Sequence, residues 1–359
     1  MPNVIFPSGA LIKEDILSIY YGATDTTCAV AQVPLQALLT SMKLPRVEDG
    51  FRRIRKTDLL VSRPDLAWES KAIFNPAVID LRGRIHVLYR AMSQDNTSVI
   101  GYAEINWLHR NVVYRSSKPI YTPRESFEQK RVSGGNSGCE DPRLTKIGET
   151  IYMYYTAYNG ITPPAVAMTC IKEKDFLAKK WSWSKPVLVT RDGVDDKDGC
   201  LHPEKVNGKY FLFHRVNNLI CGDYGETPSF KERNNFRNIP ILTPRPGMWD
   251  SLKVGISVPP IKTAKGWLLL YHGVSSISVY RIGAALLDLK DPTIVLSRTT
   301  DYIFEPLEDY EKKGQVDNVV FPCGAVLKNG SIYMYYGAGD AVIDDACIKL
   351  SDLLNALTK

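Results

Sequence analysis

One aspartate in the middle of the chain has the surroundings of a catalytic acid. Asp141 stands between Glu140 and Pro142 in the segment SGGNSGCEDPRLT, after a glycine-rich stretch, and Arg143 follows the proline. A carboxyl group at the mouth of a strand, with its backbone restrained by the following proline, is suited to general acid catalysis. A salt-bridged aspartate in a turn has the same local sequence, so Asp141 alone does not identify an enzyme.

Four basic side chains match the requirements of a phosphate dianion. They are Arg143, Lys205, Arg215 and His272. Arginine offers forked donors and lysine a point charge, and both bind phosphate oxygens through charge-assisted hydrogen bonds. Surface lysines and arginines are usually only solvated, so a phosphate site requires that the fold brings these four together.

Other ligand motifs are missing from the sequence. It has no GxxxxGK[ST] loop and no GxGxxG motif, which argues against nucleotide binding at a helix N-terminus. It has no HExxH motif and no closely spaced His/Cys cluster, so no metal site is predicted.

An internal repeat would bring distant residues together. One pattern recurs: a proline, a short apolar strand, a turn, and a second strand that ends in aromatic or basic residues. Mid-motif glycines separate two runs rich in Ile, Val, Tyr and Phe, which predicts a β-hairpin in each copy. The six copies begin at Phe6, Phe74, Glu140, Leu201, Val258 and Phe321.

The spacing of the copies predicts an all-β protein with a five-bladed β-propeller in residues 45–359. Helical signal is confined to segments such as 35–42 and 350–357, so the alternating helices of a doubly wound α/β fold are not expected. The intervals of 57 to 66 residues between the motif prolines are long enough for four-stranded blades. These prolines are Pro76, Pro142, Pro203, Pro260 and Pro322.

The sixth copy is one more than a five-bladed ring requires. Residues 3–42 parallel residues 318–357 almost position by position, so residues 1–44 are expected to form an additional, duplicated blade segment. Asp25 in GATD corresponds to Asp340 in GAGD. We favour Asp340 over Asp25 as the functional residue, because its segment continues directly from the preceding blade. The other copy should pack on the outside or against a second chain.

Equivalent positions of the copies should lie at equivalent depths around the central axis, where propellers bind ligands. A purely structural repeat would carry apolar residues there, so polar residues indicate a functional centre, with solvated loop ends as the alternative. Before the motif proline stand Asn75, Asp141, His202, Pro259 and Phe321, and the second strands end at Arg90, Tyr155, Arg215, His272 and Tyr336.

Composition limits the class of protein. The 359 residues are 44% hydrophobic and 23% charged, and the net charge of +6 is spread without long runs, so neither nucleic acid nor a membrane is an expected partner. The seven cysteines are widely spaced and include no CxxC pair, which is typical of reduced thiols. There is no signal-peptide pattern and no apolar run of membrane-spanning length. We therefore expect a cytoplasmic protein.

Eight motifs together give a family resemblance over residues 50–357: FNPAVI, LYRA, GCEDPRLT, HPEK followed by FHR, RPGMWDSLKVG, GWLLLYHGV, NVVFPCGAV and YYGAGD. With these motifs in this order, the chain resembles the β-mannoside phosphorylases of glycoside hydrolase family 130. The resemblance implies that Asp141 is the sole general acid, acting through a sugar hydroxyl. It also implies that Asn75, Arg90 and Asp340 bind the mannose before the scissile bond. Arg143, Lys205, Arg215 and His272 would bind phosphate, and Tyr155 and Asp25 are further candidates for sugar binding.

The implied reaction is an inverting phosphorolysis. Inorganic phosphate, as co-substrate and without another cofactor, attacks the anomeric carbon of a β-1,2- or β-1,4-linked manno-oligosaccharide and gives α-mannose 1-phosphate. A phosphate dianion is already a nucleophile, so one carboxylic acid suffices where an inverting hydrolase needs two. The alternatives are a β-mannoside hydrolase, a nucleotide-sugar-dependent β-mannosyltransferase, and a non-catalytic carbohydrate-binding propeller, which would not need an acid at Asp141. The linkage and the oligomeric state stay open.

Overall fold

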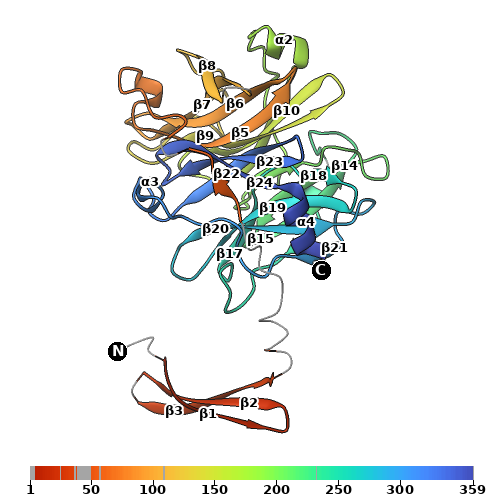
Figure 1. Cartoon of the computed structure of the whole chain (residues 1–359). Helices are drawn as coiled ribbons and strands as arrows, with labels where there is room; N and C mark the ends of the chain where they lie inside the picture. The colour runs from red at the N-terminus through yellow and green to blue at the C-terminus, as the bar shows by residue number, and fades with distance from the viewer. Residues whose placement is uncertain are drawn as a thin grey trace. The chain divides into compact units, whose positions relative to one another are not determined.

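The computed structural model describes residues 5–24, 26–35, 38, 50–55, 58–107, 110–231 and 233–358. The chain divides into two compact units, Met1–Arg46 and Val47–Lys359 (Figure 1). The described residues form mainly antiparallel strands with a few short helices, which confirms the expected all-β class. No helix among them is both long and apolar enough to cross a bilayer.

The first unit contains a three-stranded antiparallel sheet in the order β1-β2-β3. Its strands are β1 (Ile5–Lys13), β2 (Ile16–Ala23) and β3 (Thr27–Pro34). Large apolar side chains are exposed on it, with Phe6 69% exposed and Leu11 56% exposed. Apolar side chains of this size usually become buried when another element or chain packs against the strand.

The second unit begins with an eight-stranded sheet made of two antiparallel halves, β5–β8 and β9–β12. The halves meet where β7 and β9 run parallel for two residue pairs, Thr97 with Ser137 and Ser98 with Gly138. The strands are β5 (Ala72–Leu81), β6 (Arg84–Met92), β7 (Thr97–Asn106), β8 (Asn111–Arg115), β9 (Ser137–Ile147), β10 (Thr150–Tyr158), β11 (Ala165–Lys172) and β12 (Val187–Leu188).

Two further sheets follow, with four and five strands. The first consists of β13 (Lys197–Leu201), β14 (Tyr210–Val216), β15 (Leu219–Gly225) and β16 (Ile239–Leu242). The second consists of β17 (Lys253–Ile256), β18 (Ile261–Thr263), β19 (Gly266–Val274), β20 (Tyr280–Leu287) and β21 (Val295–Arg298). The helices of the unit are short: α2 (Glu173–Leu177), α3 (Asp309–Lys312) and α4 (Leu350–Thr358).

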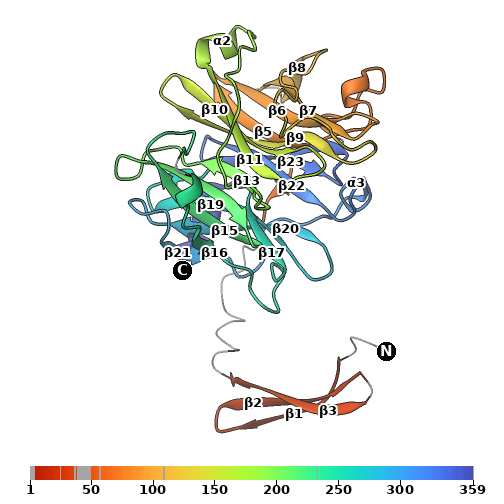
Figure 2. The ribbon, with the colours of Figure 1, turned by 180° about the vertical axis from the view of Figure 1, so that it is seen from behind.

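The last sheet joins the two ends of the second unit. Strands β22 (Val320–Lys328), β23 (Ser331–Ala338) and β24 (Val342–Lys349) come from the C-terminal end, and β4 (Arg52–Arg53) pairs with β24. The C-terminal copy of the duplicated segment is therefore part of the second unit. It lies against β5, and Figures 1 and 2 show β22 and β5 as neighbours from both sides.

Close packing against β5 requires a glycine in β22. A Cβ at Gly324 would lie 2.2 Å from the Val78 backbone nitrogen, a distance that no side chain tolerates. The first strands of the other groups also meet in chain order, because β5 contacts β9, β9 contacts β13, and β13 contacts β17. These strands carry the candidate site.

Candidate active site

Three of these first strands have a bulge where the polar residues stand. The register of β5 shifts between Phe74 and Ala77, and that of β13 between Lys197 and Cys200, while β9 bulges opposite Tyr155. At each bulge one residue has left-handed backbone: Asn75 (φ 49°), Asp141 (φ 50°) and Asp198 (φ 56°). Such positions cost on the order of 1–3 kcal/mol each and cluster at functional sites, where bulges aim side chains.

The bulges correct our alignment of the third copy. The residue equivalent to Asp141 is Asp198, not His202, which lies beyond the end of β13. The Nδ1 atom of His202 lies 2.6 Å from the Glu204 carbonyl oxygen, and its ring packs against Trp267. In the fourth copy, Pro259 likewise follows the end of β17.

Asp141 is held by a fixed amide and a fixed guanidinium. Asn75 Nδ2 donates to Asp141 Oδ1 at 2.9 Å, and Arg90 Nη1 donates to the same oxygen at 3.2 Å. Arg90 also donates from Nη2 to Glu140 Oε1 at 2.9 Å and from Nε to Ser98 Oγ at 2.9 Å. Because both contacts to Asp141 use Oδ1, its second oxygen is left to meet a ligand.

Asp340 provides a second carboxyl group in the same place. It stands between β23 and β24 with left-handed backbone (φ 49°), and it borders the same cavity as Arg90 and Glu140. Burial raises the pKa of Asp340 to about 7, and the nearby charges of Asp141 and Glu140 add to this effect, although Arg90 opposes it. Near neutral pH this carboxyl group therefore exists in both protonation states.

A group of cations gathers around Asp198. Its carboxylate accepts from Arg143 Nη2 at 3.1 Å and forms an ion pair with Arg215 Nη1 at 3.2 Å. Burial alone would raise the pKa of Asp198, but Arg215 and Arg143 hold it below its usual range. His272 Nε2 lies 3.4 Å from Arg215 Nη1. Burial and the neighbouring cations lower the pKa of His272 well below its usual value, so this imidazole is neutral.

Lys253 belongs to the same group. Its Nζ donates to the Tyr280 hydroxyl at 2.6 Å. Burial and the nearby Arg215 lower the pKa of Lys253 to about 8. The ammonium group is therefore poised to lose its proton in mildly alkaline solution.

These residues line three adjoining hollows that share side chains. The central hollow has a volume of 180 Å³, and both the residues around Asp141 and the cations around Asp198 line it. Its lining includes Asn75, Arg90, Glu140, Asp141, Lys197, Asp198, Arg215, Lys253, Tyr280, Phe321 and Asp340. On one side a hollow of 410 Å³ is lined mainly by Lys71, Met92, Asn96, Asn136, Tyr158 and Gln315. On the other side a hollow of 380 Å³ is bordered by Lys197, Arg215, Lys253, Asn217, Asn218, Val194 and Asp195. Three cations and one carboxylate line this hollow, so this end of the cleft is basic.

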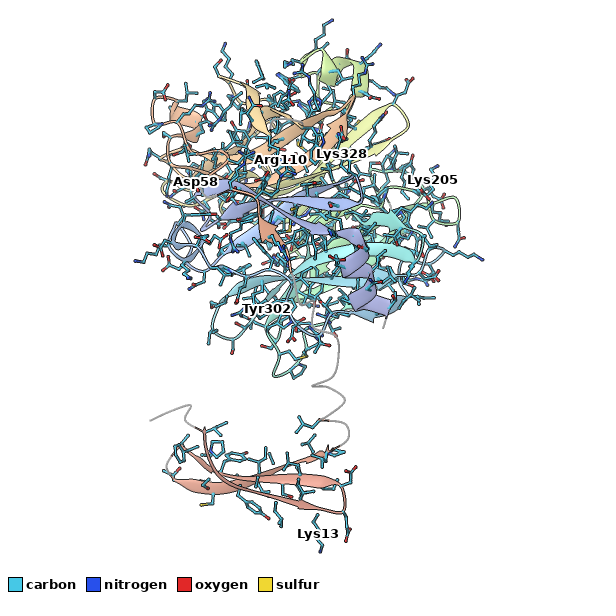
Figure 3. All side chains as sticks on the ribbon, in the orientation of Figure 1. Lys13, Asp58, Arg110, Lys205, Tyr302 and Lys328 are labelled. Carbon is cyan, nitrogen blue, oxygen red and sulfur yellow. The ribbon has the colours of Figure 1, made fainter. Side chains whose placement is uncertain are left out.

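Several expected site residues do not line this cleft. Lys205 is exposed on the turn after β13, where its Nζ lies 4.6 Å from the centre of the Tyr210 ring, and Figure 3 shows it at the periphery. Tyr155 is fully buried, and its hydroxyl contacts Tyr121 and Glu128 rather than a cavity. Asp25 lies outside the described residues.

Arg143 and His272 lie beside the cleft but are occupied by protein contacts. Arg143 is 1% exposed and donates to the carbonyl oxygens of Asp141, Ile256 and Ser257 as well as to Asp198. His272 is fully buried against the Phe321 ring. Through these hydrogen bonds Arg143 holds together the strands that carry Asp141 and Asp198.

Sequence reasoning missed Lys197, Asp198 and Lys253. The first two follow from the third copy once its bulge is placed at KDG, which two residues separate from HPEK. Lys253 stands in RPGMWDSLKVG, one of the motifs that carry the family resemblance, but the motif alone does not indicate a role for its lysine. Its position on the first strand of the fourth group was the available signal.

The comparisons with known proteins agree on one family. The family model described as beta-1,4-mannooligosaccharide phosphorylase matches residues 1–44 and 47–359. A 1,2-beta-oligomannan phosphorylase of Thermoanaerobacter sp. (strain X514) is 35% identical over 314 residues, covering 84% of this chain and 98% of that protein. A beta-1,2-mannobiose phosphorylase of the same organism is 38% identical over 321 residues, covering 83% and 98%.

Solved structures give the same result. The beta-1,2-mannobiose phosphorylase from Listeria innocua, in complex with beta-1,2-mannobiose, superposes with a TM-score of 0.65 at 27% identity, covering 88% of this chain and 95% of that chain. A second structure superposes with a TM-score of 0.73 at 27% identity, covering 86% and 96%. It comes from work on glycoside hydrolases of this family that target beta-1,2 mannosidic linkages in Candida mannan. The chain therefore belongs to glycoside hydrolase family 130, as its motifs predicted.

Proposed function

We propose that this enzyme is an inverting phosphorylase that cleaves β-1,2-linked manno-oligosaccharides with inorganic phosphate and releases α-mannose 1-phosphate. The observation that carries the proposal is the pairing, in one cleft, of Asp141 with the cations Lys197, Arg215 and Lys253. The relatives that match over nearly their whole length are named as phosphorylases of β-1,2-linked mannosides, which favours that linkage.

In this proposal Asn75, Arg90 and Asp340 hold the mannose unit that is transferred. Arg90 is fixed by Ser98 and Glu140 and cannot swing away from the sugar. Asp340 accepts a hydrogen bond from a sugar hydroxyl when ionised and donates one when protonated. Both residues lie within the central hollow, beside Asp141.

Phosphate occupies the basic end of the cleft. Lys197 and Lys253 replace Lys205 in the set of proposed ligands, because they border the cleft and Lys205 does not. Arg215 contributes a guanidinium that Asp198 already orients. A dianion set among three cations is bound through charge-assisted hydrogen bonds, and a low local dielectric strengthens them.

The chemical step follows from these positions. A phosphate oxygen attacks the anomeric carbon from the face opposite the leaving group, and a new C–O bond forms as the glycosidic C–O bond breaks. The departing sugar oxygen gains a proton that originates from Asp141, directly or through a sugar hydroxyl, and Asp141 is left ionised. The configuration inverts, so a β-mannoside gives the α-phosphate.

The test is an incubation with β-1,2- and β-1,4-mannobiose, each with and without inorganic phosphate, followed by product analysis. We expect α-mannose 1-phosphate and free mannose from the β-1,2 isomer, only when phosphate is present. Free mannose without phosphate at a comparable rate would contradict the proposal.

A β-mannoside hydrolase is the second candidate. Its support is the solved structure from the study of family hydrolases, which superposes well on this chain. An inverting hydrolase needs a carboxylate to activate water. Glu140 and Asp340 are further carboxyl groups in the cleft, but the cations at its other end would then lack a purpose. The incubation without phosphate separates the two activities.

We also propose that residues 45–359 form a five-bladed β-propeller. The five groups β5–β8, β9–β12, β13–β16, β17–β21 and β22–β24 with β4 would be its blades. Contacts between successive first strands support this arrangement, as does the pairing of β4 with β24, which would close the ring with strands from both ends of the unit. Residues 1–44 would then be a duplicated segment outside the ring. The widely spaced, unpaired cysteines favour a cytoplasmic enzyme.

A further inference from the structure

We propose that His214, through the carboxylate of Asp196, is a positioning residue that holds Lys197 in place for phosphate. The inference rests on the proposed phosphate-binding end of the cleft. It concerns a buried cluster of three side chains, Asp196, His214 and Asp223, that borders none of the hollows described above.

The cluster is a histidine clamped between two carboxylates. His214 is fully buried on β14, with Nδ1 2.7 Å from Asp196 Oδ2 and Nε2 3.0 Å from Asp223 Oδ2. Ionised carboxylates only accept hydrogen bonds, so both ring nitrogens must donate and the ring carries a positive charge. Burial works against that charge, but Asp196 and Asp223 raise the pKa of His214 to about 9. The clamp therefore persists at neutral pH.

The two carboxylates lead to different parts of the sheet. Asp223, on β15, also accepts from the backbone N–H groups of Arg237 and Asn238, at 2.6 and 3.0 Å, and so holds the loop before β16. Asp196 stands directly before Lys197, the first residue of β13. One end of the clamp is thus structural, and the other end reaches the cleft.

β13 has few ladder bonds at this end, where the Asp196 backbone N–H also donates to the Pro164 carbonyl oxygen at 3.0 Å. It pairs with β14 through Lys197 and Arg215, but the register then shifts at the bulge that contains Asp198, and pairing resumes at Cys200. A bulge interrupts the ladder that would otherwise hold the start of the strand. The bond between Asp196 and His214 spans β13 and β14 beside the interruption, and so sets the position of Lys197 relative to Arg215.

His214 and Arg215 are neighbours on β14, and successive side chains of a strand point to opposite faces. Arg215 borders the cleft, whereas the His214 ring lies in the interior against Phe236. Arg215 therefore faces the cleft, while its neighbour His214 anchors β13, the strand that carries Lys197. Because misplacement by about 1 Å can cost on the order of 100-fold in rate, such an anchor matters for phosphate.

The test compares the two ends of the clamp. In the full-length enzyme, Asp196→Ala and Asp223→Ala each remove one carboxylate from His214. We expect Asp196→Ala to raise the KM for phosphate about 10-fold while the KM for the mannoside changes less than about twofold. Asp223→Ala should lower the melting temperature at least as much as Asp196→Ala does, because it also frees the backbone N–H groups of Arg237 and Asn238. It should nevertheless leave the KM for phosphate unchanged.

Two further variants keep the experiment decisive if Asp196→Ala is too unstable to assay. Asp196→Asn still accepts from Nδ1, so it should restore most of the phosphate affinity. His214→Gln cannot serve both carboxylates, so it should raise the KM for phosphate as the alanine variant does.

An unchanged KM for phosphate in Asp196→Ala and His214→Gln would overturn the inference, as would an equal rise in Asp223→Ala, which would reveal only general loosening. If the wild-type enzyme turned over the mannoside without phosphate, the proposed function would fall and this inference with it. Phosphate-dependent wild-type turnover with an unaffected Asp196→Ala would refute the inference alone.

Discussion

Replacing Lys253 by alanine tests the basic end of the cleft most directly. Its ammonium group borders both the central hollow and the hollow beside it, and it is held by the Tyr280 hydroxyl. A hydrogen bond to a charged group contributes about 1.5–3 kcal/mol. Its loss should therefore raise the KM for phosphate roughly 10- to 150-fold, while the KM for the mannoside stays nearly constant.

Lys205→Ala is the matched control. It removes the same charge from an exposed turn outside the cleft, so the KM for phosphate should not change. The assay is initial-rate kinetics at varied phosphate and saturating β-1,2-mannobiose. Equal effects of the two substitutions would show that only the overall charge matters and would refute the assignment.

The lowered pKa of Lys253 adds a pH signature. With a pKa of about 8 the group is charged below pH 8 and loses its charge as the pH rises through that value. Phosphate binding should therefore weaken above pH 8 in the wild-type enzyme, although bound phosphate will itself shift the midpoint upwards. Lys253→Arg stays charged throughout this range, so the loss should be smaller in that variant. A wild-type KM for phosphate that is constant from pH 7 to pH 9 would contradict this account.

Four other outcomes are expected. Asp141→Asn should reduce turnover about 10²–10⁴-fold with an unchanged melting temperature, since it removes the acidic proton and keeps the shape. Gly324→Val should lower the melting temperature, because a Cβ there would lie 2.2 Å from the Val78 nitrogen, whereas Gly9→Val, with no atom within 4 Å, should not. Asp340→Ala should cost most of the activity and Asp25→Ala little, as side-by-side assays would show; the reverse would assign the sugar site to the N-terminal copy. The dependence of wild-type turnover on pH should also show a transition near pH 7, where Asp340 titrates. Asp340→Asn should abolish that transition.

The hairpins and the acidic end of the cleft were predictable from the sequence. Turn glycines and alternating apolar residues mark the strands, and the motif proline follows both Asn75 and Asp141, so these two copies aligned correctly. The third copy has no such proline at its bulge. Pro203 of HPEK stands in a similar context a few residues later. Aligning the copies on this proline selected His202 and Lys205 instead of the residues at the bulge.

The direction of side chains was the other limit. Sequence pattern paired Tyr155 with Arg90 near the end of a second strand, but the bulge in β9 lies opposite Tyr155, and its hydroxyl is buried with Tyr121. Likewise, the sequence pattern could not show that the Arg143 guanidinium donates its hydrogen bonds to backbone carbonyl oxygens. Bulges and buried hydrogen bonds depend on contacts between distant strands, which a local periodicity does not contain.

The duplicated segment places nearly the same residues in two surroundings within one chain. Tyr20 is 48% exposed and its counterpart Tyr335 is 2% exposed; Gly9 has open space where Gly324 meets backbone. The pair is therefore an internal reference that separates what a strand's own sequence contributes from what its neighbours contribute. Amide exchange measured on β1–β3 and β22–β24 in the same sample would compare similar strands in two surroundings, free of differences in buffer, temperature or chain length.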